Sequence, residues 1–94
     1  MRRTLSFSEA AARDLARLPE FLTLSSPRAA QRVRKMLLSA LQSLEEHAER
    51  GRPGPAANLR ALVIPFGSGA YVAQYRTGDD EVVVARIFHS REFR

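Results

Sequence analysis

Hydrophobic residues in the first half of the chain recur at the period of an α-helix. Residues 3–7 alternate polar and apolar side chains, which predicts a short strand. The next segment carries an apolar stripe made of Ala11, Leu15, Leu18 and Leu22. This stripe predicts a helix over 8–24. Pro19 should kink or divide that helix, because proline removes a helical hydrogen bond.

A second helix is predicted for residues 27–49. Ser26 is a good N-cap, and Pro27 suits the first helical position, where its missing N–H is not needed. Gly51 is a plausible residue just beyond the C-terminal cap. The stripe that should face the core consists of Ala30, Val33, Leu37, Leu41 and Leu44.

The hydrophobic period changes to that of β-strands after the Pro- and Gly-rich loop at 51–58. Three strands are predicted, at 59–65, 70–77 and 81–88, from a continuous apolar run, an alternating run and a run rich in β-branched residues. Turn residues at 67–69 and 78–80 separate them. The order β-α-α-β-β-β predicts an α+β fold, with two helices packed on one face of a small twisted antiparallel sheet.

Length and composition narrow the function classes. We expect residues 1–94 to form a single domain with one small core. The absence of Cys excludes disulfides and thiolate metal sites, and two His residues argue against a structural zinc site. No apolar run approaches the roughly 18 residues of a membrane span. We therefore expect a cytoplasmic protein with no cofactor, no metal and no membrane partner.

The charge indicates the kind of partner. The chain has a net charge of +5, from 15 basic and 10 acidic residues, and 14 of the basic residues are Arg. A GC-rich genome would equally explain the Arg bias. Arginine makes planar, bidentate contacts with phosphate and carboxylate groups, so nucleic acid and an acidic protein are the leading partner classes.

A polar cluster follows the last predicted strand. His89 titrates near neutral pH and suits proton transfer, but a structural hydrogen bond at the sheet margin is an equally open role. Arg91 and Glu92 either belong to a site, pair with each other or are solvated. Three further arginines are candidates for either a solvated surface or a binding site. They are Arg60, Arg76 and Arg86.

Two tyrosines on the second of these strands share one of its faces. Because Tyr71 and Tyr75 are four residues apart, alternation places both on the same side of the strand. We expect them in the core rather than on a platform for stacking bases.

The motifs together resemble the RelE/ParE toxins of type II toxin–antitoxin systems. The segment SEAAARDLARLPEFL…SPRAAQRV resembles their helical half, and GRPGP…LRALVIPFGSGAYVAQYRTGDDEVVVARIFHSRE resembles their sheet half. The sheet half carries an Arg-x-Leu strand, a Gly-x-Tyr-x-x-x-Tyr-Arg strand and a last strand ending in His-x-x-Glu. The resemblance covers nearly the whole chain. It implies a toxin neutralised by a cognate antitoxin, whose acidic, partly disordered segment wraps around it.

Within the superfamily, the residues resemble ParE more than RelE. RelE-type members cleave messenger RNA on the ribosome with basic residues around the sheet and often a late Tyr. Those ribonucleases carry basic side chains at strand positions that are occupied here by Val63, Pro65 and Val72. Arg91 is the one residue that clearly matches the ribonuclease set, and no Tyr follows it. ParE-type members inhibit DNA gyrase.

The expected function is therefore gyrase inhibition by binding, without catalytic residues. The alternative is a ribosome-dependent messenger RNA endoribonuclease, for which His89 and Arg91 are the catalytic candidates. A toxin fold that has lost its toxicity is a third possibility. In all three, Arg60, Arg76, Arg86, His89, Arg91 and Glu92 are the candidate contacts to the target or antitoxin.

Overall fold

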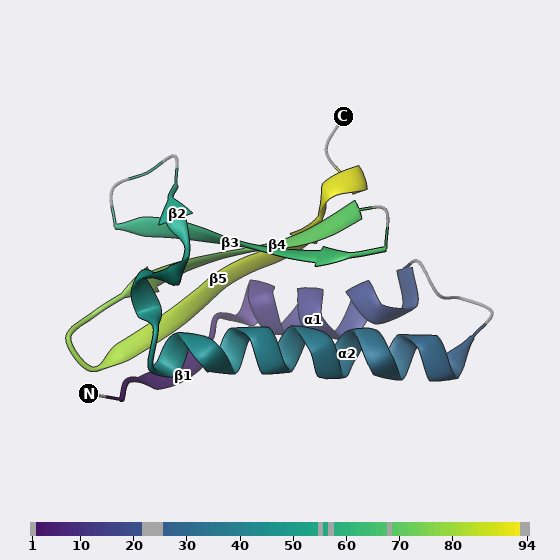
Figure 1. The fold of residues 1–94 in the computed structure, drawn as a ribbon, viewed down its shortest axis with the longest axis horizontal. Helices are drawn as coiled ribbons and strands as arrows, with labels where there is room; N and C mark the ends of the chain where they lie inside the picture. The colour runs from purple at the N-terminus through teal and green to yellow at the C-terminus, as the bar shows by residue number, and fades with distance from the viewer. Residues whose placement is uncertain (1, 22–25, 55, 57, 68, 93–94) are drawn as a thin grey trace.

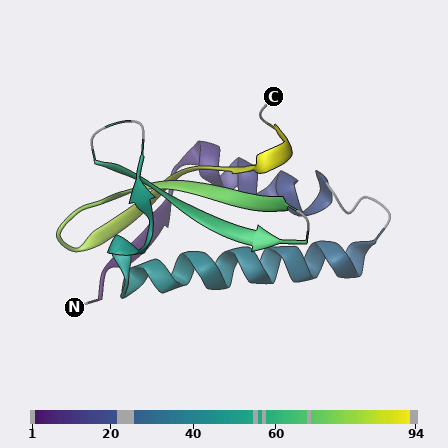
Figure 2. The same cartoon turned by 45° about the horizontal axis from the view of Figure 1, so that its top comes forward.

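The structure is a computed structural model that describes residues 2–21, 26–54, 56, 58–67 and 69–92 (Figure 1). Two helices lie on one face of a five-stranded sheet, and the other face is not covered by either helix (Figures 1 and 2). The order β-α-α-β-β-β is confirmed, with one short strand added. The elements are β1 (Thr4–Phe7), α1 (Glu9–Phe21), α2 (Pro27–Gln42), 3₁₀ turns at Ser43–Glu45 and Ala48–Arg50, β2 (Arg52–Pro53), β3 (Leu59–Phe66), β4 (Gly69–Thr77), β5 (Glu81–His89) and a 3₁₀ turn at Ser90–Glu92.

The sheet has the strand order β1-β5-β4-β3-β2 and is mixed. Strands β3, β4 and β5 form an antiparallel meander, as predicted, with a turn at Gly67 and a second connection at 78–80. However, β1 runs parallel to β5, with Thr4 opposite Glu81, so the sheet is mixed, and the predicted antiparallel pairing does not hold for β1. A tight turn forces antiparallel pairing only between strands adjacent in sequence, and the whole sheet and both helices separate β1 from β5. The strand β2 was also missed.

The second helix is shorter than predicted, and the first is described from Glu9 to Phe21. Residues 22–24 of the first prediction lie outside the described residues, and α1 continues through Pro19 without division. Pro19 lies in the last helical turn, where its missing N–H interrupts the hydrogen-bond ladder only at its end. The second helix begins as predicted, with Ser26 Oγ accepting the Ala29 N–H, but α2 ends at Gln42. There, the Ser43 hydroxyl donates to Ala40 O at 2.6 Å, and the chain tightens into 3₁₀ turns.

Gly51 does not have the left-handed conformation of a typical residue after a helix cap. Its φ of −78° is that of an extended residue. Glycine is needed because a Cβ at this position would lie 2.6 Å from Tyr75 Oη and 2.9 Å from Ala61 O. The backbone of Gly51 therefore packs directly against the edge of the core.

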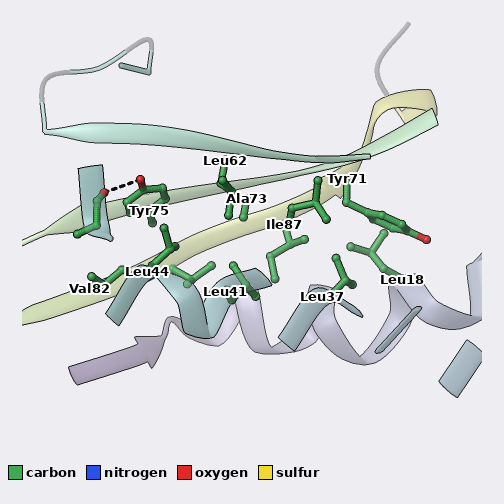
Figure 3. Close-up of a cluster of buried hydrophobic side chains, with 14 of the residues drawn as sticks. Leu18, Leu37, Leu41, Leu44, Leu62, Tyr71, Ala73, Tyr75, Val82 and Ile87 are labelled. Carbon is green, nitrogen blue, oxygen red and sulfur yellow. Dashed lines mark hydrogen bonds between the residues drawn. The ribbon is translucent and has the colours of Figure 1, made fainter. Parts of the chain in front are cut away.

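The core lies between the helices and the sheet (Figure 3). The helix stripe and the inward face of the sheet meet there, and both Tyr71 and Tyr75 are fully buried, as predicted. Among the described residues, no helix is long and apolar enough to cross a membrane. The largest fully buried core side chains contributed by the helices and the turn after them are Leu18, Val33, Leu37, Leu41 and Leu44.

Candidate functional site at the end of β5

The two halves of β5 are held along their outer edge by different groups. Glu81–Val84 pair with the backbone of β1. Beyond Val84, β1 has ended and the chain turns into α1. The register with β4 also shifts here, since Gln74 lies opposite Arg86 but Tyr75 lies opposite Val84, which leaves Ala85 as an extra, bulged residue.

Side chains replace the missing strand along the second half of β5. The Ser8 hydroxyl donates to Ala85 O at 2.8 Å. The Asp14 carboxylate accepts the Ile87 N–H at 2.8 Å, and Glu92 accepts the His89 N–H at 2.9 Å. These bonds satisfy backbone groups that would otherwise be unpaired at an edge.

Two arginines pair with the carboxylates, and Arg17 bridges them. Arg86 Nε lies 2.8 Å from Asp14 Oδ2. Arg17 contacts Asp14 Oδ1 at 3.1 Å and Glu92 Oε2 at 2.5 Å. We call these four residues, Asp14, Arg17, Arg86 and Glu92, the edge network. It joins α1 to both β5 and the C-terminal turn at Ser90–Glu92.

The edge network stabilises the charged forms of its acids. Burial alone would raise the pKa of Asp14, but hydrogen bonds from Arg86 and the Ile87 amide outweigh burial and lower that pKa. Burial would likewise raise the pKa of Glu92, and the hydrogen bond from Arg17 lowers it. Both side chains are therefore carboxylates near neutral pH, and neither can serve as a general acid there.

His89 is buried in the same corner, at 2% exposure. Its ring meets Tyr71 edge-on, with the ring centroids 4.9 Å apart. Its Nδ1 accepts the Arg91 N–H at 3.0 Å. Burial and the Arg91 charge lower the pKa of His89, so it is neutral near pH 7. This geometry fits a hydrogen bond at the sheet margin, the structural role left open by the sequence.

The six predicted site residues divide between the two ends of the sheet. His89, Arg91, Glu92 and Arg86 gather around the C-terminal turn, and Glu92 pairs with Arg17. Arg60 lies at the other end, where its Nη1 donates to Gly51 O at 2.7 Å. At that end, exposed Arg76 also lines a hollow of about 280 Å³ with Asn58, Thr77, Gly78, Glu81 and Val83.

Asp14 and Arg17 were missed by the sequence reasoning. A signal was available for Asp14, since it lies three residues after Ala11 and four before Leu18, on the buried side of α1. A carboxylate at such a position needs a partner, and Arg17, three residues later, is within reach. Among the described residues, no group of three or more His, Cys, Asp or Glu side chains could hold a metal ion.

The uncovered face of the sheet carries an apolar row. Val63 lies opposite Val72, and Val72 lies opposite Phe88, so the three side chains cross β3, β4 and β5 side by side. They point away from the core, because their chain neighbours Leu62, Ala73 and Ile87 are buried within it. Val63 is 39% exposed, and the other two are half-buried.

Comparison with known proteins identifies the family. The family described as "ParE toxin of type II toxin-antitoxin system, parDE" matches residues 5–93. The chain belongs to this ParE toxin family. The relationship predicted from the helical and sheet motifs is thereby confirmed, and the edge network and apolar row are features of a type II toxin.

Curated relatives carry the other name of the superfamily. This ParE-family toxin is 45% identical to Toxin RelE1 of Caulobacter vibrioides over 92 residues, which cover 97% of each chain. It is 43% identical to Toxin RelE3 of the same organism over 84 residues, covering 89% of this chain and 90% of the relative.

Solved structures share the fold at lower sequence identity. A chain of the chromosomal ParDE system from P. aeruginosa has a TM-score of 0.78 at 22% identity, covering 94% of this toxin and 96% of that chain. A chain of the toxin–antitoxin complex RelBE2 from Mycobacterium tuberculosis has a TM-score of 0.69 at 22% identity, covering 95% and 99%.

Proposed function

We propose that this ParE-family toxin acts by binding DNA gyrase and is neutralised by a cognate antitoxin with an acidic segment. Gyrase is the target implied by the closer resemblance to ParE. The observation that carries the proposal is the apolar row of Val63, Val72 and Phe88 at the centre of the uncovered sheet face.

The chemistry of that face suits a protein partner. Cleavage of RNA by its own 2′-hydroxyl needs a base, an acid and cations that stabilise the phosphate in the transition state. The centre of the face instead presents Val63 and Val72, and the nearby imidazole of His89 is buried, with its Nδ1 engaged by the Arg91 N–H. Apolar residues at the centre and arginines around them are typical of protein interfaces.

The opposite side of the molecule fits the antitoxin. A hollow of about 310 Å³ between the helices is lined by Phe7, Ala12, Leu15, Ala16, Arg34 and Leu38. The apolar side of an amphipathic helix would fill such a hollow, and acidic residues on it would meet Arg34 and the +5 charge of the toxin. The proteins from P. aeruginosa and M. tuberculosis that share the fold are members of toxin–antitoxin pairs.

Expression of the toxin without its antitoxin tests the target. We expect filamentation and a DNA-damage response before protein synthesis falls, and purified toxin should inhibit supercoiling by gyrase while leaving ribosome-bound messenger RNA intact. Val63→Asp places a charge in the apolar row and should raise the concentration for half-inhibition at least tenfold, since residues at the centre of an interface dominate its affinity. Ser39→Asp, on the exposed surface of α2, is the control and should change the concentration for half-inhibition less than twofold.

The alternative is ribosome-dependent cleavage of messenger RNA, which the RelE names of the curated relatives favour. Cuts in messenger RNA within minutes of induction would support it, especially if Arg91→Ala abolished them. Under the gyrase proposal, Arg91→Ala instead weakens inhibition without abolishing it, because no single side chain acts as a catalyst.

A further inference from the structure

We propose that Arg17 is a positioning residue of the toxin: by holding Glu92, it fixes the C-terminal turn and sets the direction in which Arg91 faces the target. The inference rests on the proposed action of Arg91 at the target surface. No motif of the sequence points to Arg17, which is one of several arginines on α1 and α2.

The C-terminal turn depends on side chains for its position. Ser90 Oγ accepts the Ala70 N–H at 3.2 Å, which ties the turn to β4. Glu92 ties it to the last residue of β5 through the His89 N–H. Arg17 then ties Glu92 to α1, with Nη1 2.5 Å from Oε2 and Nη2 3.4 Å from Oε1. A guanidinium that contacts both carboxylate oxygens fixes orientation as well as distance.

Strand pairing cannot supply this tie, because β1 ends at Phe7 and pairs only as far as Val84. The turn lies beyond the reach of that strand, so α1 supplies a side chain in its place. Arg91 lies between the two anchored residues, Ser90 and Glu92, and its own N–H is held by His89 Nδ1. The backbone direction at Arg91 therefore follows from how Glu92 is held.

Arg17 can be removed without dismantling its surroundings. Asp14 keeps its bonds to Arg86 and the Ile87 N–H, and Glu92 keeps its bond to the His89 N–H. The Arg17 side chain is 41% exposed, and an ion pair at such an exposed position contributes little to folding. A loss of activity larger than the loss of stability would therefore indicate that Arg17 acts by positioning Arg91.

The test compares Arg17→Ala with Arg13→Ala. Arg13 lies one turn earlier on the same helix and pairs with the fully exposed Glu9. Two activities are measured: the inducer level that arrests growth without antitoxin, and the inhibition of supercoiling. We expect Arg17→Ala to weaken both about tenfold and Arg13→Ala to leave both within twofold, with closely similar urea midpoints for the two variants.

A double-mutant cycle separates positioning from direct contact. Glu92→Gln keeps an oxygen that can accept the His89 N–H but loses the charge that pairs with Arg17. If Arg17 acts through Glu92, Arg17→Ala has little further effect on activity in the Glu92→Gln background. Hydrogen exchange of the His89 amide should also be faster in Arg17→Ala and unchanged in Arg13→Ala.

Three results would overturn the inference. They are an equal loss of activity on Arg17→Ala in both backgrounds, no loss in either, and a wild-type toxin that arrests no growth. If the wild-type toxin arrests growth but leaves gyrase untouched, the proposed target is wrong, and the growth comparison still tests the role of Arg17.

Discussion

Tyr71 and Tyr75 occupy equivalent positions at opposite ends of the core but have different surroundings. Both come from β4, face the helices and are fully buried (Figure 3). The Tyr75 hydroxyl donates to Ala48 O at 2.7 Å and accepts the Gly51 N–H at 2.8 Å. The Tyr71 hydroxyl has no hydrogen-bond partner among the described residues.

This difference in hydrogen bonding indicates that the two ends of the core have different roles. At the Tyr75 end, a buried hydroxyl joins the sheet to the 3₁₀ turn at Ala48–Arg50, and its hydrogen bonds are satisfied. At the Tyr71 end, the ring packs against His89, and the buried hydroxyl has no partner in the described part of the chain, which costs about 1–3 kcal/mol. The satisfied hydrogen bonds stabilise the first end, and four of the six candidate functional residues, Arg86, His89, Arg91 and Glu92, lie toward the second.

The largest expected effect comes from filling the space between Gly51 and Tyr75. Gly51→Ala should lower the free energy of unfolding by about 3 kcal/mol, the upper part of the range for overpacking. Its Cβ would meet Ala61 O at 2.9 Å, a backbone atom that cannot move without disturbing β3. Urea unfolding followed by circular dichroism measures the change. Gly78→Ala, whose Cβ would approach only the flexible Glu81 side chain at 3.3 Å, is the control.

Removal of the tyrosine hydroxyls gives the next largest expected effect on the free energy of unfolding. Tyr75→Phe should cost about 2 kcal/mol, because it leaves the Ala48 carbonyl and the Gly51 N–H without their buried partner. Tyr71→Phe removes a hydroxyl that makes no such bond, and stability should stay the same or rise by up to about 1 kcal/mol. Equal costs for the two variants in urea unfolding would contradict the comparison.

The smallest expected effect is a pH dependence of the free energy of unfolding that comes from His89, the neighbour of Tyr71. Burial and the Arg91 charge lower the pKa of His89 in the folded state below its ordinary value of 6.5. The unfolded chain therefore takes up a proton first, and stability present above pH 6.5 is lost as the pH falls through the folded pKa. Unfolding midpoints at several pH values should show this loss in the wild type and in Tyr75→Phe. His89→Gln should remove it, and an unchanged slope in that variant would assign the loss to another group.

The sequence predicted the parts of the fold that depend on local patterns. The helical stripes and the three consecutive strands have clear periods, and glycines mark the turns between those strands. The bulge at Ala85 could not be predicted, because Val82 to Ala85 form a continuous apolar run with no alternation that a shift would break. The direction of β1 depends on a pairing with the far end of the chain, which no local signal encodes.

The candidate site shows the same limit. His89, Arg91 and Glu92 were found because they follow one another at the end of a strand. The local pair of Asp14 and Arg17 was overlooked, and their other partners, on β5 and the C-terminal turn, are 72 to 75 residues away in the sequence. Only the end of β1 at Phe7 exposes the backbone that Asp14 binds, and no pattern within α1 reveals that.

The parallel pairing of β1 with β5 affects how the toxin folds during its synthesis on the ribosome. Thr4 is made long before its partner Glu81, because the helices and the other strands lie between them in the sequence. Synthesis proceeds from the N-terminus, so the two helices can pack together before β5, the partner strand of β1, has been made. Contacts between such distant residues form late, since the chain must first be closed into a long loop. The nascent toxin therefore completes its sheet only after β5 has emerged from the ribosome.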